Sequence, residues 1–418
     1  MDRASKPVLL ILSQVYIPDP AAVGQHIADV AEEMVHRGWR VVVYTSRRGY
    51  DDPATIFPAR ETLHGVEVRR LPLSSFGKHS IPVRLVGQSL FMAQAVLRSL
   101  FMRRIDAVLV STSPPFAGIG GAIVSLLRRA PLTWWVMDIN PDQMITSGRL
   151  AATSLIARCF DAMNRVTLRS ASRVVVLDRF MRDRILAKCD VGEKLTVIGP
   201  WAHEDRLEPL PHDKNPFRER HGLSGKVVVM YSGNHGFSTP VATLLEAAQR
   251  LSSVPDLQFV FIGGGVLKKD VDRFVSDARP PNIVSLPYQP LETIRYSLSA
   301  ADIQVVSIAN EAVGVVHSCK IYGAMAVGRA VLSIGPGASH ANDIVVRERI
   351  GWSCRQGEVE SLVATLRVIA GTPREDLEEM GLRARRALQR HYSREQSLDA
   401  ICDVICQPPD SALMDRAP

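Results

Sequence analysis

Residues 226–233 read Lys226-Val-Val-Val-Met-Tyr-Ser-Gly233, a run of β-branched and apolar residues that ends at a glycine. Such a run predicts a buried strand followed by a tight turn. A helical pattern follows at Thr243–Leu251. The same order begins the chain, where Val8–Ser13 precedes a helix-period stretch at Gly24–Arg37 that stops at Gly38. This alternation indicates parallel sheets covered by helices, an α/β fold.

Further short apolar runs extend the pattern on both sides of residue 205. In the first half the predicted strands are Val8–Ser13, Arg40–Thr45, Val66–Leu71, Ala107–Ser111, Leu132–Met137, Arg173–Leu177 and Leu195–Ile198. In the second half they are 226–233, Gln258–Gly263, Ile283–Pro287, Ile303–Val306 and Ala330–Ile334.

A segment rich in proline and charge, Glu204–Ser224, separates the two halves and reads as a linker. We therefore expect two Rossmann-like domains, residues 1–205 and 206–406, that face each other across a cleft, with a disordered tail at 407–418. The final helix can pack back on the first domain. Ligands of such sheets bind at the carboxyl ends of the strands, so chemistry should follow the strands.

Composition excludes several classes of protein. The chain has 418 residues, 46% hydrophobic and 22% charged, which is typical of a soluble globular protein. Its six cysteines form no CxxC pair, which predicts free thiols in a reducing compartment and no metal site. The net charge of +7 favours an acidic partner. Because the sequence contains no nucleic-acid-binding motif, we do not expect the partner to be a nucleic acid.

We expect no signal peptide at the start of the chain. Met1–Lys6 is polar, and the apolar run from Val8 is too short for a signal peptide or a membrane span. The sequence therefore predicts a cytoplasmic protein, peripheral at most at the inner face of the membrane.

The strongest candidate site is His317-Ser-Cys-Lys320, which precedes a helix of small residues. Amide groups at a helix start together with the Lys320 ammonium and the Ser318 hydroxyl suit an anionic group such as a diphosphate. Two glycine turns after strands, Gly233-Asn234 and Gly263-Gly264-Gly265, would let a nucleotide approach the backbone closely. The alternative for both turns is a purely structural role.

Three further residues follow predicted strands. Asp138 comes after an apolar strand, where a carboxylate could orient a substrate hydroxyl or cap the next helix. Glu311 follows another strand and is either a contact to substrate or a solvated loop residue. Gly24 lies in a Pro-rich loop that leads into a helix, and it serves either close ligand approach or ordinary packing.

Residues Arg84–Arg104 combine four arginines with large apolar side chains, among them Leu85, Phe91, Met92, Val96, Leu97, Leu100, Phe101 and Met102. This pattern is compatible with an amphipathic basic helix that lies on an anionic membrane surface. The alternative is a core helix with one solvated face.

The ordered set of motifs resembles the retaining glycosyltransferases of family 4 with the two-domain GT-B fold, in the branch that builds capsule, O-antigen and colanic-acid sugars. The resemblance spans roughly residues 7–400. It rests on Tyr16–Val41, on Val174–Asp178 with Lys194–Trp201, and on the second-half motifs Tyr231–Gly236 and Ser318–Gly328.

This resemblance implies a hexosyltransferase-like enzyme that needs no metal or other cofactor. The second domain would hold a nucleotide-diphosphate sugar and the first an acceptor. Asp138, Glu311 and Lys320 would be catalytic. The residues implied to bind the sugar donor are Gly24, Gly233, Asn234, Gly265, Ser318, Cys319, Ile321 and Tyr322.

The chain departs from the family pattern in four places. Glu311 has the family's Glu-x-x-Gly context but lies four residues further from the helix than the family glutamate, whose position is taken by Val315. Gly323 stands where many members have a second glutamate, and Met137 stands where many have a histidine. Residues 237–241 contain no Arg or Lys, although the family often uses such residues there to bind diphosphate. We therefore expect Lys320 to offset more of the charge.

Three functions stay open. The first is transfer of a sugar to a lipid-linked or cell-surface glycan, in polysaccharide or lipopolysaccharide biosynthesis. The second is glycosylation of a soluble small molecule. The third is a non-catalytic partner that binds sugar nucleotides within a polysaccharide assembly complex.

Overall fold

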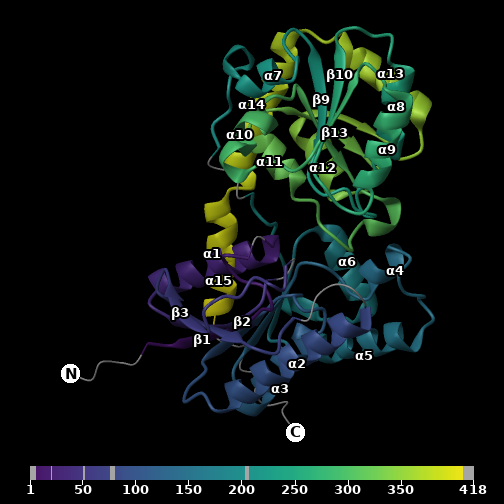
Figure 1. The fold of residues 1–418 in the computed structure, drawn as a ribbon. Coiled ribbons are helices and arrows are strands. Elements are labelled where there is room, and N and C mark those ends of the chain that lie inside the picture. Colours follow the sequence, from purple (N-terminus) through teal and green to yellow (C-terminus); the bar gives the residue numbers. More distant parts are fainter. Residues whose placement is uncertain (1–5, 20, 50–51, 76–80, 203–206, 408–418) are drawn as a thin grey trace. The chain divides into compact units, whose positions relative to one another are not determined.

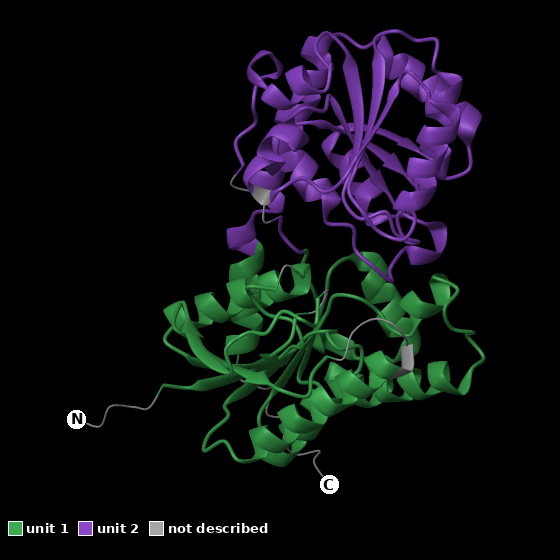
Figure 2. Cartoon of the chain, in the orientation of Figure 1, with its two compact units in different colours: residues 1–199, 397–418 green, residues 200–396 purple. Residues whose placement is uncertain are grey.

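A computed structural model describes residues 6–19, 21–49, 52–75, 81–202 and 207–407, without the side chains of 81, 82 and 291. The chain forms two compact units (Figure 2): residues 1–199 with 397–418, and residues 200–396. We call them unit 1 and unit 2. The boundary lies a few residues before the expected position, and the chain returns to unit 1 at Ser397. Of the expected tail 407–418, only Gln407 is described.

Unit 1 is built on an eight-stranded sheet with the order β3-β4-β2-β1-β5-β6-β7-β8 (Figure 1). Every pair is parallel except β3 with β4. The strands are β1 (Val8–Leu12), β2 (Arg40–Ser46), β3 (Arg60–Leu63), β4 (Val66–Leu71), β5 (Ala107–Val110), β6 (Leu132–Val136), β7 (Arg173–Val176) and β8 (Leu195–Val197).

The sequence predicted these strands within one or two residues, with β3 as the exception. Its side chains alternate between exposed and half-buried, so it has no apolar run to detect. A two-residue turn joins it to β4, in which His64 and Gly65 both have positive φ, 48° and 83°. Such turns are typical of β-hairpins.

The helices of unit 1 follow its strands as the pattern predicted. They are α1 (Ala22–His36), α2 (Ile81–Leu100), α3 (Ala117–Arg128), α4 (Asp142–Thr146), α5 (Leu155–Ser170) and α6 (Arg179–Lys188). Gly38 ends α1 with φ of +88°, a conformation that glycine adopts at little cost. At the far end of the chain, α15 (Arg394–Cys406) supplies Asp399 and Asp403, which pair with Arg37 at 2.8 and 2.6 Å.

Unit 2 has a six-stranded, wholly parallel sheet with the order β11-β10-β9-β12-β13-β14. The strands are β9 (Val227–Ser232), β10 (Leu257–Ile262), β11 (Ile283–Leu286), β12 (Ile303–Ser307), β13 (Ala330–Ile334) and β14 (Gly351–Cys354). The short edge strand β14 was not predicted, because its residues Gly-Trp-Ser-Cys carry no β-branched side chain.

The helices of unit 2 cover both faces of its sheet. In β13, Leu332 packs into one core with Leu244 of α8, and Val331 packs into another with Met325 of α11. The helices are α7 (Pro216–Arg220), α8 (Ala242–Arg250), α9 (Lys268–Ala278), α10 (Ile294–Ser299), α11 (Lys320–Ala326), α12 (His340–Glu348), α13 (Val359–Ala370) and α14 (Arg374–His391). The predicted α/β class with two parallel-sheet domains is therefore confirmed.

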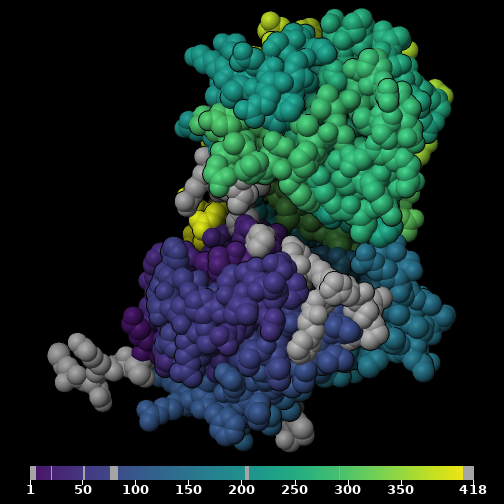
Figure 3. Space-filling view, viewed as in Figure 1, coloured from purple at the N-terminus to yellow at the C-terminus, as the bar shows by residue number. Residues whose placement is uncertain are grey.

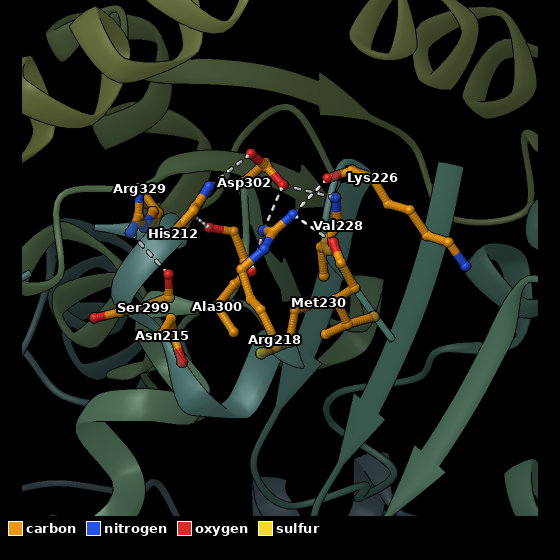
Figure 4. Close-up of polar contacts among 12 residues, drawn as sticks. His212, Asn215, Arg218, Lys226, Val228, Met230, Ser299, Ala300, Asp302 and Arg329 are labelled. Carbon is orange, nitrogen blue, oxygen red and sulfur yellow. Dashed lines mark hydrogen bonds and ion pairs between the residues drawn. The ribbon is translucent and has the colours of Figure 1, made fainter. Parts of the chain in front are cut away.

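A buried polar cluster joins the start of unit 2 to the amino ends of its strands (Figure 4). The Arg218 guanidinium, only 1% exposed, donates hydrogen bonds to the carbonyl of Ala300 at 2.7 Å and to Asp302 at 3.1 Å. The same Asp302 carboxylate accepts the Val228 amide of β9 at 2.8 Å. These bonds fix the linker side of the unit to β9 and β12.

Candidate functional site

Two glycine turns lie together at the carboxyl edge of the unit 2 sheet. Gly233 follows β9, and Gly263 and Gly265 follow β10, with φ of +131°, +136° and +113°. The Gly233 amide donates to the carbonyl of Ile262 at 2.9 Å, and the His235 amide donates to that of Gly264 at 2.7 Å. Only glycine adopts such φ values readily, so these positions require it for the turn itself.

Lys320 lies across the Gly233 turn. A Cβ built on Gly233 would lie 2.6 Å from Lys320 Cε, and the ammonium is 5.5 Å from the ring centroid of Tyr231. Among the described residues this ammonium has no hydrogen bond and no carboxylate partner. Burial lowers the pKa of Lys320 to about 8. The lysine is therefore a cation at neutral pH, partly removed from water and without a counter-ion in the part of the chain that the structure describes.

Ser318 and His340 form a second polar group beside Lys320. The Ser318 amide donates to Nε2 of His340 at 3.1 Å. This contact corrects the expectation that the Ser318 amide is free, because the first residue of α12 already occupies it. The Ser318 hydroxyl oxygen is buried and has no hydrogen-bond partner in the described part of the chain. The hydroxyl, rather than the amide, is thus available to a ligand.

The side chains of Ile321 and Tyr322 do not belong to an anion site, contrary to the sequence expectation. Both lie in the hydrophobic core under α11, with 0% and 2% exposure. The reason is that α11 begins at Lys320, which turns the next two side chains toward the sheet. Cys319 packs partly against the same core, with its Sγ 3.9 Å from the carbonyl oxygen of His317.

Asn234 and Glu311 lie in loops at the same edge of unit 2. The carbonyl of Asn234 accepts the Tyr231 hydroxyl at 2.6 Å, and its side-chain oxygen lies where a Cβ on Gly265 would be. Glu311 is exposed on the 3-10 turn Asn310–Ala312 that follows β12. Gly233, Asn234, Gly265, Ser318 and Lys320 are therefore brought to one edge, with Glu311 in a loop of that edge.

Asp138 belongs to unit 1 and follows β6. Its amide donates to the hydroxyl of Thr112 at 3.2 Å, whereas no described residue hydrogen-bonds its carboxylate. Burial raises the pKa of Asp138 to about 6. The alternative that it caps the next helix is wrong, because α4 begins at Asp142 with Pro141 in the capping position.

Gly24 also lies in unit 1, in the first turn of α1. A Cβ at this position would lie 3.1 Å from the backbone nitrogen of Tyr16 and 3.2 Å from its Cα. Gly24 therefore lets α1 pack against the loop after β1. This contact supports the packing alternative of the sequence analysis.

Sequence reasoning missed His340, and with it the histidine pair of this edge. The His340 ring stacks on His317 with centroids 3.9 Å apart, and Nε2 of His317 lies 2.9 Å from the Tyr322 hydroxyl. The sequence feature that could have identified His340 is the stretch Gly335-Pro-Gly-Ala-Ser-His340. This stretch follows strand β13, just as the other loops of the site follow strands.

Two family models match the chain. The one described as glycosyl transferase 4-like domain matches residues 21–201, and the one described as glycosyl transferases group 1 matches residues 213–387. Together they cover most of the sequence, with one model on each unit.

Two named relatives each match about three quarters of the chain. A probable glycosyltransferase WbjE from Pseudomonas aeruginosa is 28% identical over 306 residues, which are 72% of this chain and 75% of the relative. A putative colanic acid biosynthesis glycosyl transferase WcaI from Escherichia coli strain K12 is 22% identical over 332 residues, 77% of this chain and 81% of the relative.

Among solved structures, Anabaena HepE in complex with UDP has the same fold. Its TM-score is 0.69 at 16% identity, over 95% of this chain and 98% of that one. The fold, the two family models and the relatives agree: the chain belongs to the family 4 glycosyltransferases with the GT-B fold.

Proposed function

We propose that this glycosyltransferase moves a sugar from a nucleotide-diphosphate donor to a lipid-linked or cell-surface glycan, with retention of the anomeric configuration. Unit 2 holds the sugar donor, and unit 1 holds the acceptor at the cytoplasmic face of the inner membrane. Three comparisons support this proposal: HepE was solved with UDP, WcaI is named for colanic acid biosynthesis, and WbjE is named a glycosyltransferase.

The observation that carries the proposal is the unpartnered Lys320 ammonium over the Gly233 turn. In the reaction, the bond between the anomeric carbon and a diphosphate oxygen breaks, and the acceptor oxygen forms the new bond to that carbon. The acceptor proton leaves with the departing phosphate oxygen or to solvent. Negative charge grows on the diphosphate as the bond breaks, so a fixed cation stabilises the transition state more than the ground state.

Other residues take supporting roles in this proposal. The free Ser318 hydroxyl donates a hydrogen bond to a phosphate oxygen. Asp138 accepts a hydrogen bond from the acceptor hydroxyl and orients it. Glu311 contacts the hydroxyls of the transferred sugar.

The proposal includes no metal ion, because Lys320 offsets the charge that a divalent cation offsets elsewhere. We therefore expect sugar transfer to continue in the presence of a chelator. Loss of activity with EDTA that added Mg²⁺ or Mn²⁺ restores would contradict this part of the proposal.

The test is a transfer and donor-hydrolysis assay over a set of nucleotide sugars with purified glycolipid acceptors. We expect Lys320→Ala to lower kcat/KM by at least about tenfold, which is about 1.4 kcal/mol of transition-state stabilisation. Lys226→Ala is the matched control, because Lys226 already bonds to Gln258 at 3.0 Å at the opposite edge.

Two outcomes point to the other functions. Nucleotide binding without turnover, for every donor and acceptor tested, indicates a non-catalytic partner in an assembly complex. Efficient transfer only to a water-soluble acceptor indicates glycosylation of small molecules.

A further inference from the structure

The helix α2 turns a stripe of apolar side chains outward rather than into the core. Val86, Leu90, Leu97 and Phe101 are 55%, 37%, 57% and 82% exposed. The spacing of four and seven residues places Val86, Leu90 and Leu97 on one side of the helix, and Phe101 follows directly after its last residue. The opposite side of α2 buries Phe91 and faces the core. The helix is thus apolar on two sides, which a helix with one solvated face is not.

The neighbouring helices continue this apolar surface. Helices α2, α3 and α5 lie side by side in unit 1, with α3 in the middle (Figure 1). In the space-filling view, their residues belong to the blue surface of unit 1 (Figure 3). The large exposed apolar side chains of α3 and α5 are Ile123 (42%), Leu126 (68%), Leu127 (58%), Leu155 (79%), Ile156 (51%) and Val166 (47%). Large exposed apolar side chains that gather on neighbouring helices are typical of an interaction site.

An open apolar groove of about 350 Å³ runs between α2 and α3. Its walls are almost free of polar atoms and include Met92, Val96 and Leu100 from α2 and Phe116, Ile119 and Ile123 from the α3 side. The groove has the chemistry of a hydrocarbon-binding site rather than of a sugar site.

The charge on this surface is mainly positive, and the carboxylate of α5, Asp161, pairs with Lys188 at 2.6 Å. The sequence contains no Asp or Glu at 68–105 or at 107–137, and Asp106 between these ranges pairs with Arg104 at 2.8 Å. Arg98, Arg103 and Arg129 are exposed, and none of them has an ion pair or hydrogen bond among the described residues. These three arginines lie close in sequence to Leu97, Phe101 and Leu127, at the ends of α2 and α3. The two helix ends are joined by a hydrogen bond from Arg128 to the carbonyl of Leu100 at 2.7 Å.

We propose that the α2–α3–α5 face docks on an anionic phospholipid bilayer. Leu97, Phe101 and Leu126 enter the headgroup–acyl boundary, a lipid acyl chain lies in the groove, and the three free arginines bind headgroup phosphates. Apolar insertion and cationic attraction together are what interfacial helices use. A second copy of the chain is a poorer occupant, because a self-complementary contact would bring these arginines close to their own copies.

This inference deepens the proposed function, since it names the surface that brings unit 1 to a lipid-linked acceptor. Docking itself needs neither sugar donor nor acceptor. No described helix is long and apolar enough to cross a bilayer, so the proposal concerns surface binding.

The test is flotation of the full chain with vesicles, without nucleotide sugar. We expect the protein to float with vesicles that contain phosphatidylglycerol and to stay behind with pure phosphatidylcholine. Replacing Arg98, Arg103 and Arg129 by Gln should lower the partition coefficient about fivefold for each arginine. Phe101→Glu should lower it by at least about tenfold.

Matched controls come from α13 of unit 2, where Val368 is 60% exposed and Arg367 is exposed and unpaired among the described residues. Val368→Glu and Arg367→Gln should float as the wild type does. Phe101→Trp is a conservative second variant. The new tryptophan adds fluorescence to that of the wild type, and lipids with brominated acyl chains should quench this added fluorescence.

Several results would overturn the docking proposal. These are absence of flotation with phosphatidylglycerol, equal loss in the α13 controls, and added fluorescence in the Phe101→Trp variant that brominated lipids leave unquenched. A change in oligomeric state in Phe101→Glu, without any vesicle binding by the wild type, would assign the face to a second copy of the chain. If docking fails while donor hydrolysis persists, the proposed transferase function still stands.

Discussion

Each edge of the unit 2 sheet holds a cation, buried at the amino edge and half-buried at the carboxyl edge, and the two cations differ in their hydrogen bonding. At the amino edge, Arg218 donates to the carbonyls of Ala300, Leu223 and Lys226 at 2.6 to 2.7 Å and to the Asp302 carboxylate (Figure 4). At the carboxyl edge, no described residue offers the Lys320 ammonium an acceptor.

The contrast separates structure from function on physical grounds. A buried charge is costly unless it is paired and hydrogen-bonded. Arg218 meets that requirement within the fold, so its bonds serve the fold. The Lys320 ammonium has no hydrogen-bond acceptor among the described residues, and its burial lowers the pKa to about 8. An anion that binds there supplies what the fold lacks, and this is why we assign the site to Lys320.

The largest effect is expected at the amino edge. Asp302→Ala should lower the free energy of unfolding by about 3–5 kcal/mol, because it leaves a buried Arg218 charge without its partner. The measurement is chemical denaturation. Asp272→Ala is the control: Asp272 pairs with Lys268 at the surface, and its loss should cost less than about 1 kcal/mol. A comparable loss in both variants would remove the distinction between the edges.

Asp138→Asn should lower kcat by about tenfold or more, the range expected for a group that helps proton transfer. Because burial raises the pKa of Asp138 to about 6, the ionised form predominates at neutral pH. The wild-type kcat should fall as pH drops through about 6, and the Asn variant should lack this fall. The nucleotide affinity should stay unchanged, and a matching loss of that affinity would show that the acceptor-side role is wrong.

Lys320→Met should separate stability from activity. We expect kcat/KM to fall by at least about tenfold while the free energy of unfolding stays constant or rises, because the variant removes an unpartnered charge. A loss of stability as large as that of Asp302→Ala would show that Lys320 serves the fold.

The pH dependence of stability has a definite sign at this site. Lys320 has a pKa of about 8 in the fold against 10.5 for an ordinary lysine. Between these values the unfolded chain binds the additional proton, so stability rises with pH across this window. The rise should be smaller in Lys320→Met, as thermal melts at matched ionic strength would show.

Much of the fold could be predicted from the sequence, because buried parallel strands are continuous apolar runs with glycine turns. Strands such as β9 and β13 are of this kind. Strands β3 and β14 lack the pattern, because β3 alternates between exposed and half-buried residues and β14 has no β-branched side chain.

The site was predictable in its residue types but not in its contacts. Lys320 and Gly233 were identified from the sequence as candidate site residues. The Ser318–His340 hydrogen bond could not be predicted, because it joins residues 22 positions apart and depends on how α12 packs. The side chains of Ile321 and Tyr322 lie in the core, which the sequence did not indicate when it suggested both residues for donor binding. The apolar and basic residues of Arg84–Arg104 could be identified from the sequence. That α3 packs between this helix and α5 could not, because it depends on tertiary contacts.

The most direct measurement is the affinity for a nucleoside diphosphate as a function of pH, without metal ions. The probe is the uridine, guanosine or thymidine diphosphate that raises the melting temperature most. If Lys320 binds the diphosphate, affinity falls as pH rises through about 8, and Lys320→Met binds about tenfold more weakly below pH 8 with no such fall. An affinity that is independent of pH in this range, or equal in the wild type and the variant, would contradict the account.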